Sequence, residues 1–160
     1  MKKTLLALAL AGFATTASAD ALIYGGANVG QSDLNGETST SSTVYVGTGI
    51  LPFLGIEAGY TNLGSFDQSA GVETKATTKF IAARPSVDLG PLHIYGRAGL
   101  QAWETTTTGQ PDDDGVDIMY GFGAEYFMMG PFSVGAGYEV YEMDDDRVET
   151  FTLNATFHFL

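Results

Sequence analysis

The stretch Leu92–Trp103, LHIYGRAGLQAW, alternates between two kinds of residue. Its even positions, from Leu92 to Ala102, are uniformly apolar, whereas its odd positions carry all the polar chemistry, including the charge of Arg97. Because successive side chains of a strand point to opposite faces, this period of two predicts a β-strand that separates two different surroundings. Only one of these surroundings accommodates an arginine.

The rest of the chain repeats this pattern between turns of two lengths. Short Pro/Gly turns lie at residues 51–55, 88–92 and 128–132. Longer polar stretches, expected to be loops, lie at residues 31–43, 61–73, 105–117 and 142–147. Three short turns and four long connections predict eight strands with both termini at the short-turn end. The fourth strand is the least regular, and a bulge is expected near Pro85.

The two faces of the predicted strands differ in kind. One face is apolar, whereas the other holds Gly, Thr, Tyr and Asn together with charges of both signs. A soluble sandwich would expose its polar face to water, but small residues and opposite charges are typical of a packed interior. Strands of about ten residues span a bilayer when tilted, and closure satisfies every edge. We therefore predict an all-β fold, an eight-stranded antiparallel up-and-down transmembrane β-barrel. The inward charges are expected at Glu57, Arg84, Arg97, Glu125 and Glu139.

The inward charges allow two interpretations. Arg97 and Glu125 lie at similar heights above the short turns, about six and five residues up, so they are expected to meet across the ladder. A gate or ion path is one function for such charges. A plug is the favoured one, because eight strands enclose a lumen that side chains fill. Burial makes pairing of these charges necessary in either case.

The first residues predict export from the cytoplasm. Lys2 and Lys3 precede an apolar run, and Ala17–Ser18–Ala19 forms an A-x-A site. This layout predicts a cleaved secretory signal peptide at residues 1–19 and a barrel domain at residues 20–160. The chain contains no cysteine, so no disulfide stabilises it. Its formal net charge of −12 argues against nucleic acid as a partner.

Several segments resemble a known family. YGGANVGQSDL at 24–34, GIEAGYTNLG at 55–64, IYGRAGLQAW at 94–103 and the aromatic final strand are similar to the small eight-stranded outer-membrane barrels of Gram-negative bacteria, the OmpA-like and OmpX/Ail-like porin family. The resemblance implies an outer-membrane location among lipid and lipopolysaccharide. It also implies a lumenal salt-bridge network of Glu57, Arg97, Glu125 and Glu139. Recognition of the last strand by the barrel-assembly machinery is implied through Phe157 and Phe159.

The leading function predicted from the sequence is non-enzymatic: a structural or surface-interaction barrel of the adhesion or colonisation type. Loops on a rigid scaffold commonly carry such contacts, and residues 31–43 and 105–117 are the favoured contact sites. Host surface molecules or divalent cations are the expected partners of the acidic loops. The candidate contact residues are Asp33, Glu37, Asp112, Asp113, Asp114, Asp117, Asp144, Asp145 and Asp146.

Metal and cofactor sites are not expected. Placing Gly115 at position 6 of an EF-hand loop puts Gly121 where the pattern requires glutamate, so the pattern fails. A solvated acidic loop is the favoured interpretation of these residues. A looser divalent-cation contact remains an alternative. No cofactor is predicted.

Two other functions remain open. A narrow porin-like pore would use the inward charges as an ion path. A lipid-modifying enzyme would need a serine nucleophile within about 3 Å of a basic histidine. His93 and His158 both fall near the short-turn end, and Ser86 and Ser133 are candidate nucleophiles near His93. Rim histidines without a catalytic role are favoured.

Overall fold

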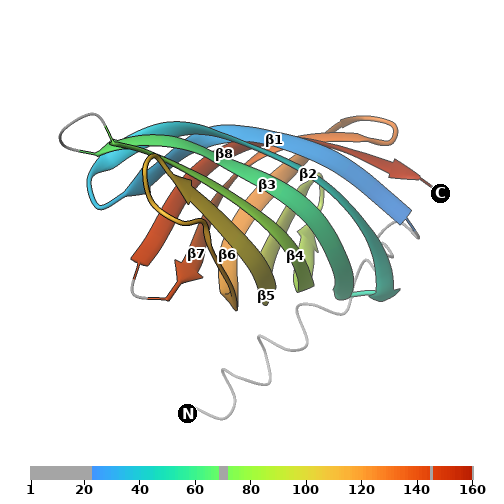
Figure 1. Ribbon diagram of the computed structural model, residues 1–160. Coiled ribbons are helices and arrows are strands. Elements are labelled where there is room, and N and C mark those ends of the chain that lie inside the picture. The colour runs from blue at the N-terminus through green and yellow to red at the C-terminus, as the bar shows by residue number, and fades with distance from the viewer. Residues whose placement is uncertain (1–22, 69–71, 145, 160) are drawn as a thin grey trace, which may run out of the picture.

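The protein is a closed eight-stranded antiparallel barrel, which confirms the predicted fold class (Figure 1). The computed structural model describes residues 23–68, 72–144 and 146–159, so the predicted signal peptide at 1–19 lies outside the described residues. No helix able to span a membrane occurs in those three ranges. The strands are β1 Ile23–Leu34, β2 Glu37–Leu51, β3 Leu54–Gln68, β4 Val72–Leu89, β5 Leu92–Thr107, β6 Asp113–Met129, β7 Phe132–Met143 and β8 Asp146–Phe159.

Pairing of the first and last strands closes the sheet. The β1–β8 ladder runs from Ile23 opposite Phe159 to Leu34 opposite Val148 without a shift in register. Closure leaves no strand edge unpaired, which a hydrocarbon medium requires. Ile23 and Phe159 therefore lie at the end of the barrel that carries the three short turns, here named the turn end. The opposite end is named the hairpin end.

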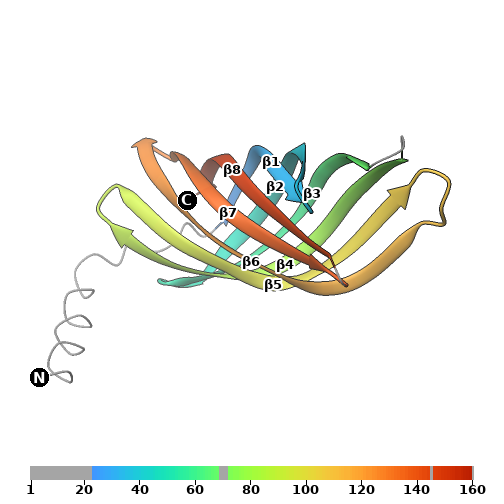
Figure 2. The same ribbon diagram turned by 90° about the vertical axis from the view of Figure 1, so that its left-hand side faces the viewer.

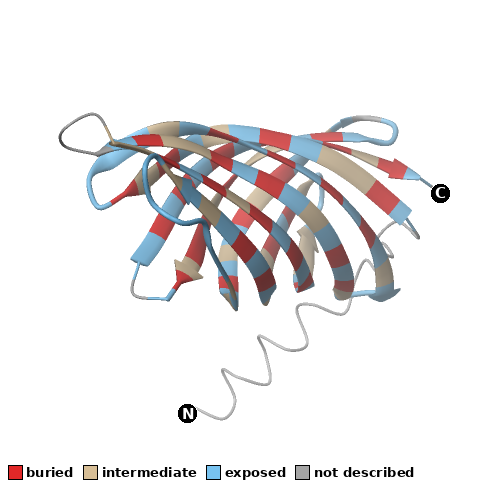
Figure 3. Ribbon diagram, in the orientation of Figure 1, coloured by how far each residue is buried: buried red, intermediate tan, exposed pale blue. Residues whose placement is uncertain are grey.

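Inward and outward side chains alternate along every strand, as the banding in Figure 3 shows. On β1, Asn28 is 4% exposed whereas its neighbour Val29 is 60% exposed. Large apolar side chains on the outside remain accessible on all eight strands. A water-soluble protein would bury most of these side chains. The accessible apolar belt thus has the form of a surface that meets lipid.

The long polar stretches are mostly strand rather than loop, which corrects the sequence-based interpretation. β1 continues to Leu34 and β2 begins at Glu37, so only Asn35 and Gly36 connect them. Both residues have positive φ, 55° and 90°, as a tight hairpin turn of the primed type requires. Ser- and Thr-rich segments pair because backbone hydrogen bonds form regardless of side-chain polarity. Figure 2 shows the β5–β6 hairpin reaching away from the barrel at the hairpin end.

The strand register is irregular, but not at the position near Pro85 where a bulge was expected. The β4–β5 ladder keeps one register on both sides of Pro85, with Ala83 opposite Ala98 and Ser86 opposite Tyr95. The bulge expected near Pro85 is therefore wrong, because a proline removes one donor without having to shift the strand. The β3–β4 ladder shifts instead between Asn62 and Gly64. Gly64 adopts a φ of 98°, which favours glycine.

Candidate functional site

Five consecutive strands each contribute one charged side chain to the barrel interior. They are Glu57 on β3, Arg84 on β4, Arg97 on β5, Glu125 on β6 and Glu139 on β7. None of the five is more than 3% exposed. Each lies on the inward parity of its strand, so the alternation of the sequence places all five in one interior. The structure thus brings the whole predicted set together.

Two arginines and three glutamates form a connected set of ion pairs. The Arg84 Nη2 lies 2.8 Å from the Oε1 of Glu125, and the Arg84 Nε lies 3.6 Å from the Oε2 of Glu57. Arg97 pairs with both Glu57 and Glu139. Glu57 therefore links the two arginines. Such a connected set compensates charges whose isolated burial would be very costly.

The expected contact between Arg97 and Glu125 is replaced by other pairs. The β5–β6 ladder places Arg97 opposite Gly121, and Glu125 opposite His93. Neighbouring strands of a closed barrel are staggered, so equal height above two short turns does not mean equal height in the sheet. Counting residues from the turns ignores this stagger. Glu125 consequently finds its cation on β4, at Arg84.

Polar neighbours donate further hydrogen bonds to the carboxylates of Glu125 and Glu139. Glu125 accepts hydrogen bonds from Ser133 Oγ at 2.9 Å, Asn154 Nδ2 at 2.9 Å and Thr156 Oγ1 at 3.1 Å. The Tyr141 hydroxyl donates to Glu139 Oε2 at 2.6 Å. Hydrogen bonds to an ionised group are among the stronger ones in proteins. They hold the interior charges in fixed positions.

Aromatic rings cover the faces of both guanidinium groups. The Arg84 guanidinium carbon lies 4.1 Å from the Tyr95 ring centroid and 4.9 Å from that of Tyr24. Arg97 lies 5.3 Å from the Tyr45 ring and 5.4 Å from the Phe80 ring. Cation–π attraction at such distances stabilises a desolvated cation. Sequence reasoning missed these rings as arginine partners, although each occupies the inward parity of its strand.

An apolar cluster fills the interior near the hairpin end, and sequence reasoning missed it. Leu63 and Phe66 on β3 are fully buried there, as is Val148 on β8. Trp103 is only 7% exposed and belongs to the same cluster. The available signal was the appearance of large apolar residues such as Leu63 and Val148 on the inward parity. Phe66 has the opposite parity in the sequence and faces inward only because the β3–β4 register shifts between Asn62 and Gly64. The cluster also includes Leu34, Ala76, Met119, Tyr141 and Met143.

The acidic contact candidates lie at the hairpin end, and several stabilise turns. Asp33 Oδ1 accepts from the Gly36 amide at 3.0 Å, and Asp146 Oδ1 accepts from Asn35 Nδ2 at 3.0 Å. Asp117 Oδ2 accepts from the Asp144 amide at 3.2 Å. Glu37 begins β2, Asp113 and Asp114 begin β6, and Asp112 immediately precedes it. Asp145 lies outside the described residues.

The described residues contain no group of three or more His, Asp or Glu side chains suited to hold a metal ion. Four of the acidic residues at the hairpin end, Asp113, Asp114, Asp117 and Asp144, line one small pocket there. Their individual roles in turns explain part of this acidic composition.

The two histidines lie near the turn end, each beside a hydrogen-bonding group. Ser133 Oγ lies 2.9 Å from His158 Nε2, whereas the Nδ1 of His93 lies 2.5 Å from Asp88 Oδ1. Ser133 thus contacts His158 rather than His93, with which it was grouped in the enzyme hypothesis. Ser86 lies opposite Tyr95 in the ladder. The Ser133 hydroxyl also reaches Glu125, so its position serves the interior network.

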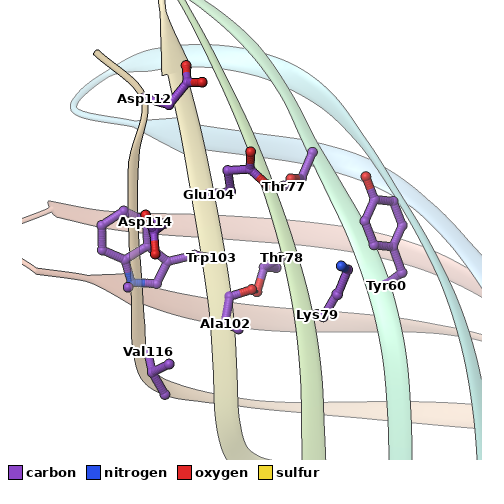
Figure 4. Close-up of a pocket in the computed structure, with 11 residues that line it drawn as sticks. Tyr60, Thr77, Thr78, Lys79, Ala102, Trp103, Glu104, Asp112, Asp114 and Val116 are labelled. Carbon is purple, nitrogen blue, oxygen red and sulfur yellow. The ribbon is translucent and has the colours of Figure 1, made fainter.

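A groove of about 410 Å³ lies across β3, β4, β5 and β6 near the hairpin end (Figure 4). Lys79 lies between Tyr60 and Ala102 in this view, and Trp103 lies beside Asp114. Sequence reasoning did not single out this groove. Its other lining residues are Thr77, Thr78, Glu104, Asp112, Gly115 and Val116.

Comparison with known proteins agrees with this architecture. Outer membrane protein A of Escherichia coli O157:H7 is 34% identical over 151 residues, which cover 79% of this chain and 43% of that protein. The chain thus spans less than half the length of that curated relative.

Solved structures share the fold at low identity. Neisserial surface protein A, NspA, has a TM-score of 0.67 at 16% identity, over 86% of this chain and 96% of its own. Ail, the attachment invasion locus protein of Yersinia pestis, in complex with the heparin analogue sucrose octasulfate, has a TM-score of 0.61 at 19% identity, with the same coverage. The outer membrane enzyme PagL has a TM-score of 0.51 at 14% identity, over 85% of this chain and 99% of its own.

The family description "Outer membrane protein beta-barrel domain" matches residues 4–159, nearly the whole chain. The closed barrel, its accessible apolar belt and its paired interior charges fit that description. The resemblance drawn from the strand segments is confirmed, as is the outer-membrane location. The chain belongs to the outer membrane protein beta-barrel domain family.

Proposed function

We propose that this chain is a non-enzymatic outer-membrane barrel whose own side chains close the lumen and whose hairpin end makes contacts at the cell surface. The observation that carries the proposal is the interior ion-pair set, in which Glu57 joins both Arg84 and Arg97. An ion crossing the barrel would have to displace these pairs and their hydrogen-bonding neighbours. The energetic cost of unpairing buried charges supports a closed lumen.

The apolar cluster gives a second reason for a closed lumen. Leu63, Phe66 and Val148 have no exposed surface and occupy the interior near the hairpin end. An ion that entered from this end would meet desolvating side chains before it met any compensating charge. Apolar side chains at a constriction exclude ions in this way.

The surface role rests on the hairpins. Paired strands carry acidic residues beyond the apolar belt, and Asp112 and Asp114 are exposed at the end of the β5–β6 hairpin. Rigid hairpins present side chains at little entropic cost, which favours recognition. The acidic composition favours divalent cations, or basic groups on a host surface, as partners. The proposal also includes two further partners, the lipopolysaccharide that surrounds the barrel and the barrel-assembly machinery.

The Ail structure offers an instructive contrast. It holds sucrose octasulfate, a strongly anionic molecule. The hairpins of the present chain carry Asp33, Glu37, Asp112, Asp113 and Asp114, and these would repel such a ligand. We therefore assign this chain a cationic class of partner within the same general surface role.

Recordings from single barrels in planar lipid bilayers test the closed lumen. The refolded barrel is expected to give no steady conductance, and reproducible channel steps at constant amplitude would favour the alternative of a narrow pore. Binding of whole cells to host surfaces, with and without calcium, tests the surface role. Shortening the β1–β2 and β5–β6 hairpins one at a time should reduce binding while the barrel keeps its heat-dependent gel mobility.

A lipid-modifying enzyme is the second candidate, and the contact between Ser133 and His158 favours it. The 2.9 Å separation suits proton transfer from a nucleophile to a base. However, Ser133 is 1% exposed and also donates to Glu125. A substrate ester bond would have to enter the packed interior to reach it. Burial therefore supports the non-enzymatic proposal.

The division of the chain is part of the same proposal. Residues 1–19 act as a signal peptide that is removed on export, and residues 20–160 form the mature barrel. Mass spectrometry of the protein extracted from outer membranes is expected to give an N-terminus at Asp20. An N-terminus at Met1 would contradict this division.

A further inference from the structure

The β5–β6 hairpin extends further from the barrel than the neighbouring β7–β8 hairpin (Figure 2). Toward the hairpin end, the β6–β7 ladder stops at Met119 opposite Tyr141. The β5–β6 ladder continues to Thr105 opposite Asp113. Residues 113–118 are therefore paired with β5 on one side, whereas no described strand pairs with them on the other. These six residues are here named the free edge of β6.

Hydrogen bonds show which backbone groups face the gap between β6 and β7. The Ile118 amide donates to Asp117 Oδ1 at 2.9 Å, and the same carboxylate accepts at 3.2 Å from the amide of Asp144, which follows β7. Gln101 Nε2 donates to the carbonyl oxygens of Ile118 and Glu142, at 3.3 and 2.7 Å. Ile118 thus directs its N–H and C=O toward β7, and side chains take the place of the missing strand.

The next two residues on this side of the free edge lack such substitutes. Backbone groups alternate between the two sides of a strand, so Val116 and Asp114 face the same gap as Ile118. Residues of the other parity face β5, as the Phe127 amide does when it donates to the Pro91 carbonyl at 2.9 Å. Within the described chain, no strand or side chain bonds to the N–H and C=O groups of Val116 and Asp114. Such groups are a template for an added strand.

The unpaired groups lie beyond the hydrocarbon. Val116 is opposite Ala102, which in turn is opposite Lys79 on the outer wall. Asp114 lies further toward the hairpin end, opposite Glu104. Charged side chains on the outer wall are costly within hydrocarbon, so these rows lie outside it. Closure therefore pairs the strands along the apolar belt, and this edge is unpaired only where water and soluble polypeptides have access.

A pocket of about 270 Å³ lies beside the free edge. Val116 and Asp114 line it from β6, and Asp144 lines it from the end of the β7–β8 hairpin. Trp103 also lines it and lies beside Asp114 in Figure 4. The indole fits there because Gly115 has no side chain, since a Cβ at that position would come within 2.6 Å of the ring. The pocket thus offers backbone groups, carboxylates and an aromatic ring to one ligand.

The charge of the pocket selects among occupants. Its carboxylates belong to Asp113, Asp114, Asp117 and Asp144, and none of its lining residues is basic. A second copy of this chain does not suit the edge, because pairing two such edges would oppose like charges. The described residues provide no group suited to hold a metal ion. A basic polypeptide in extended conformation suits both the edge and its charge.

We propose that the free edge of β6 binds an extended basic segment of a partner protein, which joins the sheet as an additional strand. The N–H and C=O groups of Val116 and Asp114 pair with the backbone of the segment, and its Lys or Arg side chains contact the carboxylates of the pocket. The inference rests on the proposed function for the exposure of the hairpin end at the cell surface. It adds the class of partner and the mode of contact.

Calorimetry with synthetic peptides tests the proposal on the refolded barrel in phosphatidylcholine nanodiscs. The probe is a short peptide of alternating lysine and valine. Its fully N-methylated counterpart keeps the charge but has no backbone N–H donor, and a glutamate–valine peptide reverses the charge. We expect the lysine–valine peptide to bind at least about tenfold more tightly than either control. Equal binding of the N-methylated peptide would overturn the added strand.

Variants then locate the contact. Val116→Pro removes the N–H that faces the gap and should weaken peptide binding by about tenfold, whereas Val116→Ala keeps this donor and should bind as the wild type does. Asp114→Asn should weaken binding by about threefold. Asp67→Asn is its control, because Asp67 is exposed on the β3–β4 hairpin instead. Heat-dependent gel mobility confirms folding of each variant. Unchanged binding by folded Val116→Pro would overturn the assignment.

Amide hydrogen exchange, followed by NMR, reports directly on the edge. In the free barrel the Val116 amide should exchange faster than that of Gly115, which faces β5. The lysine–valine peptide should slow exchange at Val116 and Asp114 by about tenfold or more and leave Gly115 unchanged. Exchange at Val116 that the peptide does not slow would overturn the proposal. Protection of Val116 that rises with barrel concentration alone would overturn it in favour of pairing between two copies.

The inference and the proposed function can fail separately. Binding of whole cells that needs the β5–β6 hairpin but is unchanged in Val116→Pro would overturn the added strand and leave the surface role intact. Peptide binding at the edge by a barrel that conducts ions steadily would support the added strand and contradict the closed lumen.

Discussion

Arg84 on β4 and Glu125 on β6 form an ion pair of 2.8 Å although β5 lies between their strands. The pair therefore crosses the interior of the barrel rather than following one ladder of the sheet. Glu57, on the other side of β4, binds the same arginine at 3.6 Å. Contacts of this kind tie non-neighbouring strands together and oppose changes in the shape of the barrel.

The energy of this pair is measurable by a double-mutant cycle. Arg84→Met and Glu125→Gln are each expected to lower the free energy of unfolding by about 3–5 kcal/mol, because each leaves a buried charge short of its partner. The double variant should lose less than the sum of the two single losses, since it removes both charges. Urea titration of the barrel in lipid vesicles measures all four proteins. Strict additivity would mean that the two residues do not interact.

Replacement of Arg97 by alanine tests the role of the interior charges. Arg97→Ala leaves Glu57 and Glu139 without this shared cation, so the melting temperature of the barrel should fall substantially. The conductance in planar bilayers should stay at baseline, because the apolar cluster near the hairpin end remains. Lys75→Ala is the control, since exposed ion pairs contribute only about 0–1 kcal/mol. A fully stable Arg97→Ala barrel would argue against a structural role.

Two adjacent glycines of β1 allow the effect of an added methyl group to be compared on the inward and outward faces of the barrel wall. A Cβ on the inward Gly26 would lie 2.6 Å from the carbonyl oxygen of Ala155 and 2.5 Å from the Tyr45 hydroxyl, whereas one on Gly25 meets nothing closer than 3.5 Å. Gly26→Ala should therefore destabilise the barrel by about 1–3 kcal/mol through overpacking, and Gly25→Ala should be nearly neutral. Thermal unfolding followed by gel mobility compares them. Equal stability of the two variants would show that the interior accommodates the added methyl group without strain.

The histidines allow a direct test of the enzyme alternative. Overproduction of the wild-type chain is expected to leave the mass spectrum of lipid A unchanged. Overproduction of the His93→Ala or the His158→Ala variant should give the same unchanged spectrum. The physical reason is that Ser133, the hydroxyl beside His158, is buried and engaged by Glu125. A new lipid A species that appears with the wild type and vanishes in either variant would favour catalysis instead.

The acidic hairpin end predicts a low affinity for sulfated sugars. Sucrose octasulfate should not bind measurably to the barrel in calorimetry at physiological ionic strength, because Asp112, Asp113 and Asp114 oppose its charge. Replacing these three residues by asparagine should raise the affinity, and added calcium should do the same for the wild type. Tight, calcium-independent binding by the wild type would contradict the assignment of a cationic partner class.

Much of the fold could be predicted from the sequence because membrane barrels separate their two faces so strictly. The alternation around Arg97 already assigned one face to the interior, and the same parity rule placed Glu57 and Glu139 there. The pairing of these charges was harder to predict. It depends on the stagger between strands, which no local pattern encodes, and Glu125 pairs with Arg84 for that reason.

The sites that the sequence did not reveal have a common physical cause. The groove beside Lys79 is assembled from four strands, and its charges look like ordinary surface residues when each strand is considered alone. The apolar cluster around Phe66 also needs the closed barrel before its members meet. The polar composition of residues 31–43 indicated a loop, but most of these residues pair as strands. Side-chain polarity says little about backbone pairing once a turn such as Asn35–Gly36 aligns two strands.

If the hairpin end faces the cell exterior, as the proposed function requires, the Asn35–Gly36 turn has a consequence for the resistance of the protein to proteases. A digestive protease must draw an extended, unpaired segment of several residues into its cleft, and β1 and β2 remain hydrogen-bonded up to Leu34 and Glu37. Among the connections at this end whose residues are all described, only residues 108–112 offer a longer unpaired segment. Shaving of intact cells by proteases would therefore spare the first hairpin and cut at the third. Antibodies against the first hairpin would have to recognise folded strands rather than a linear peptide.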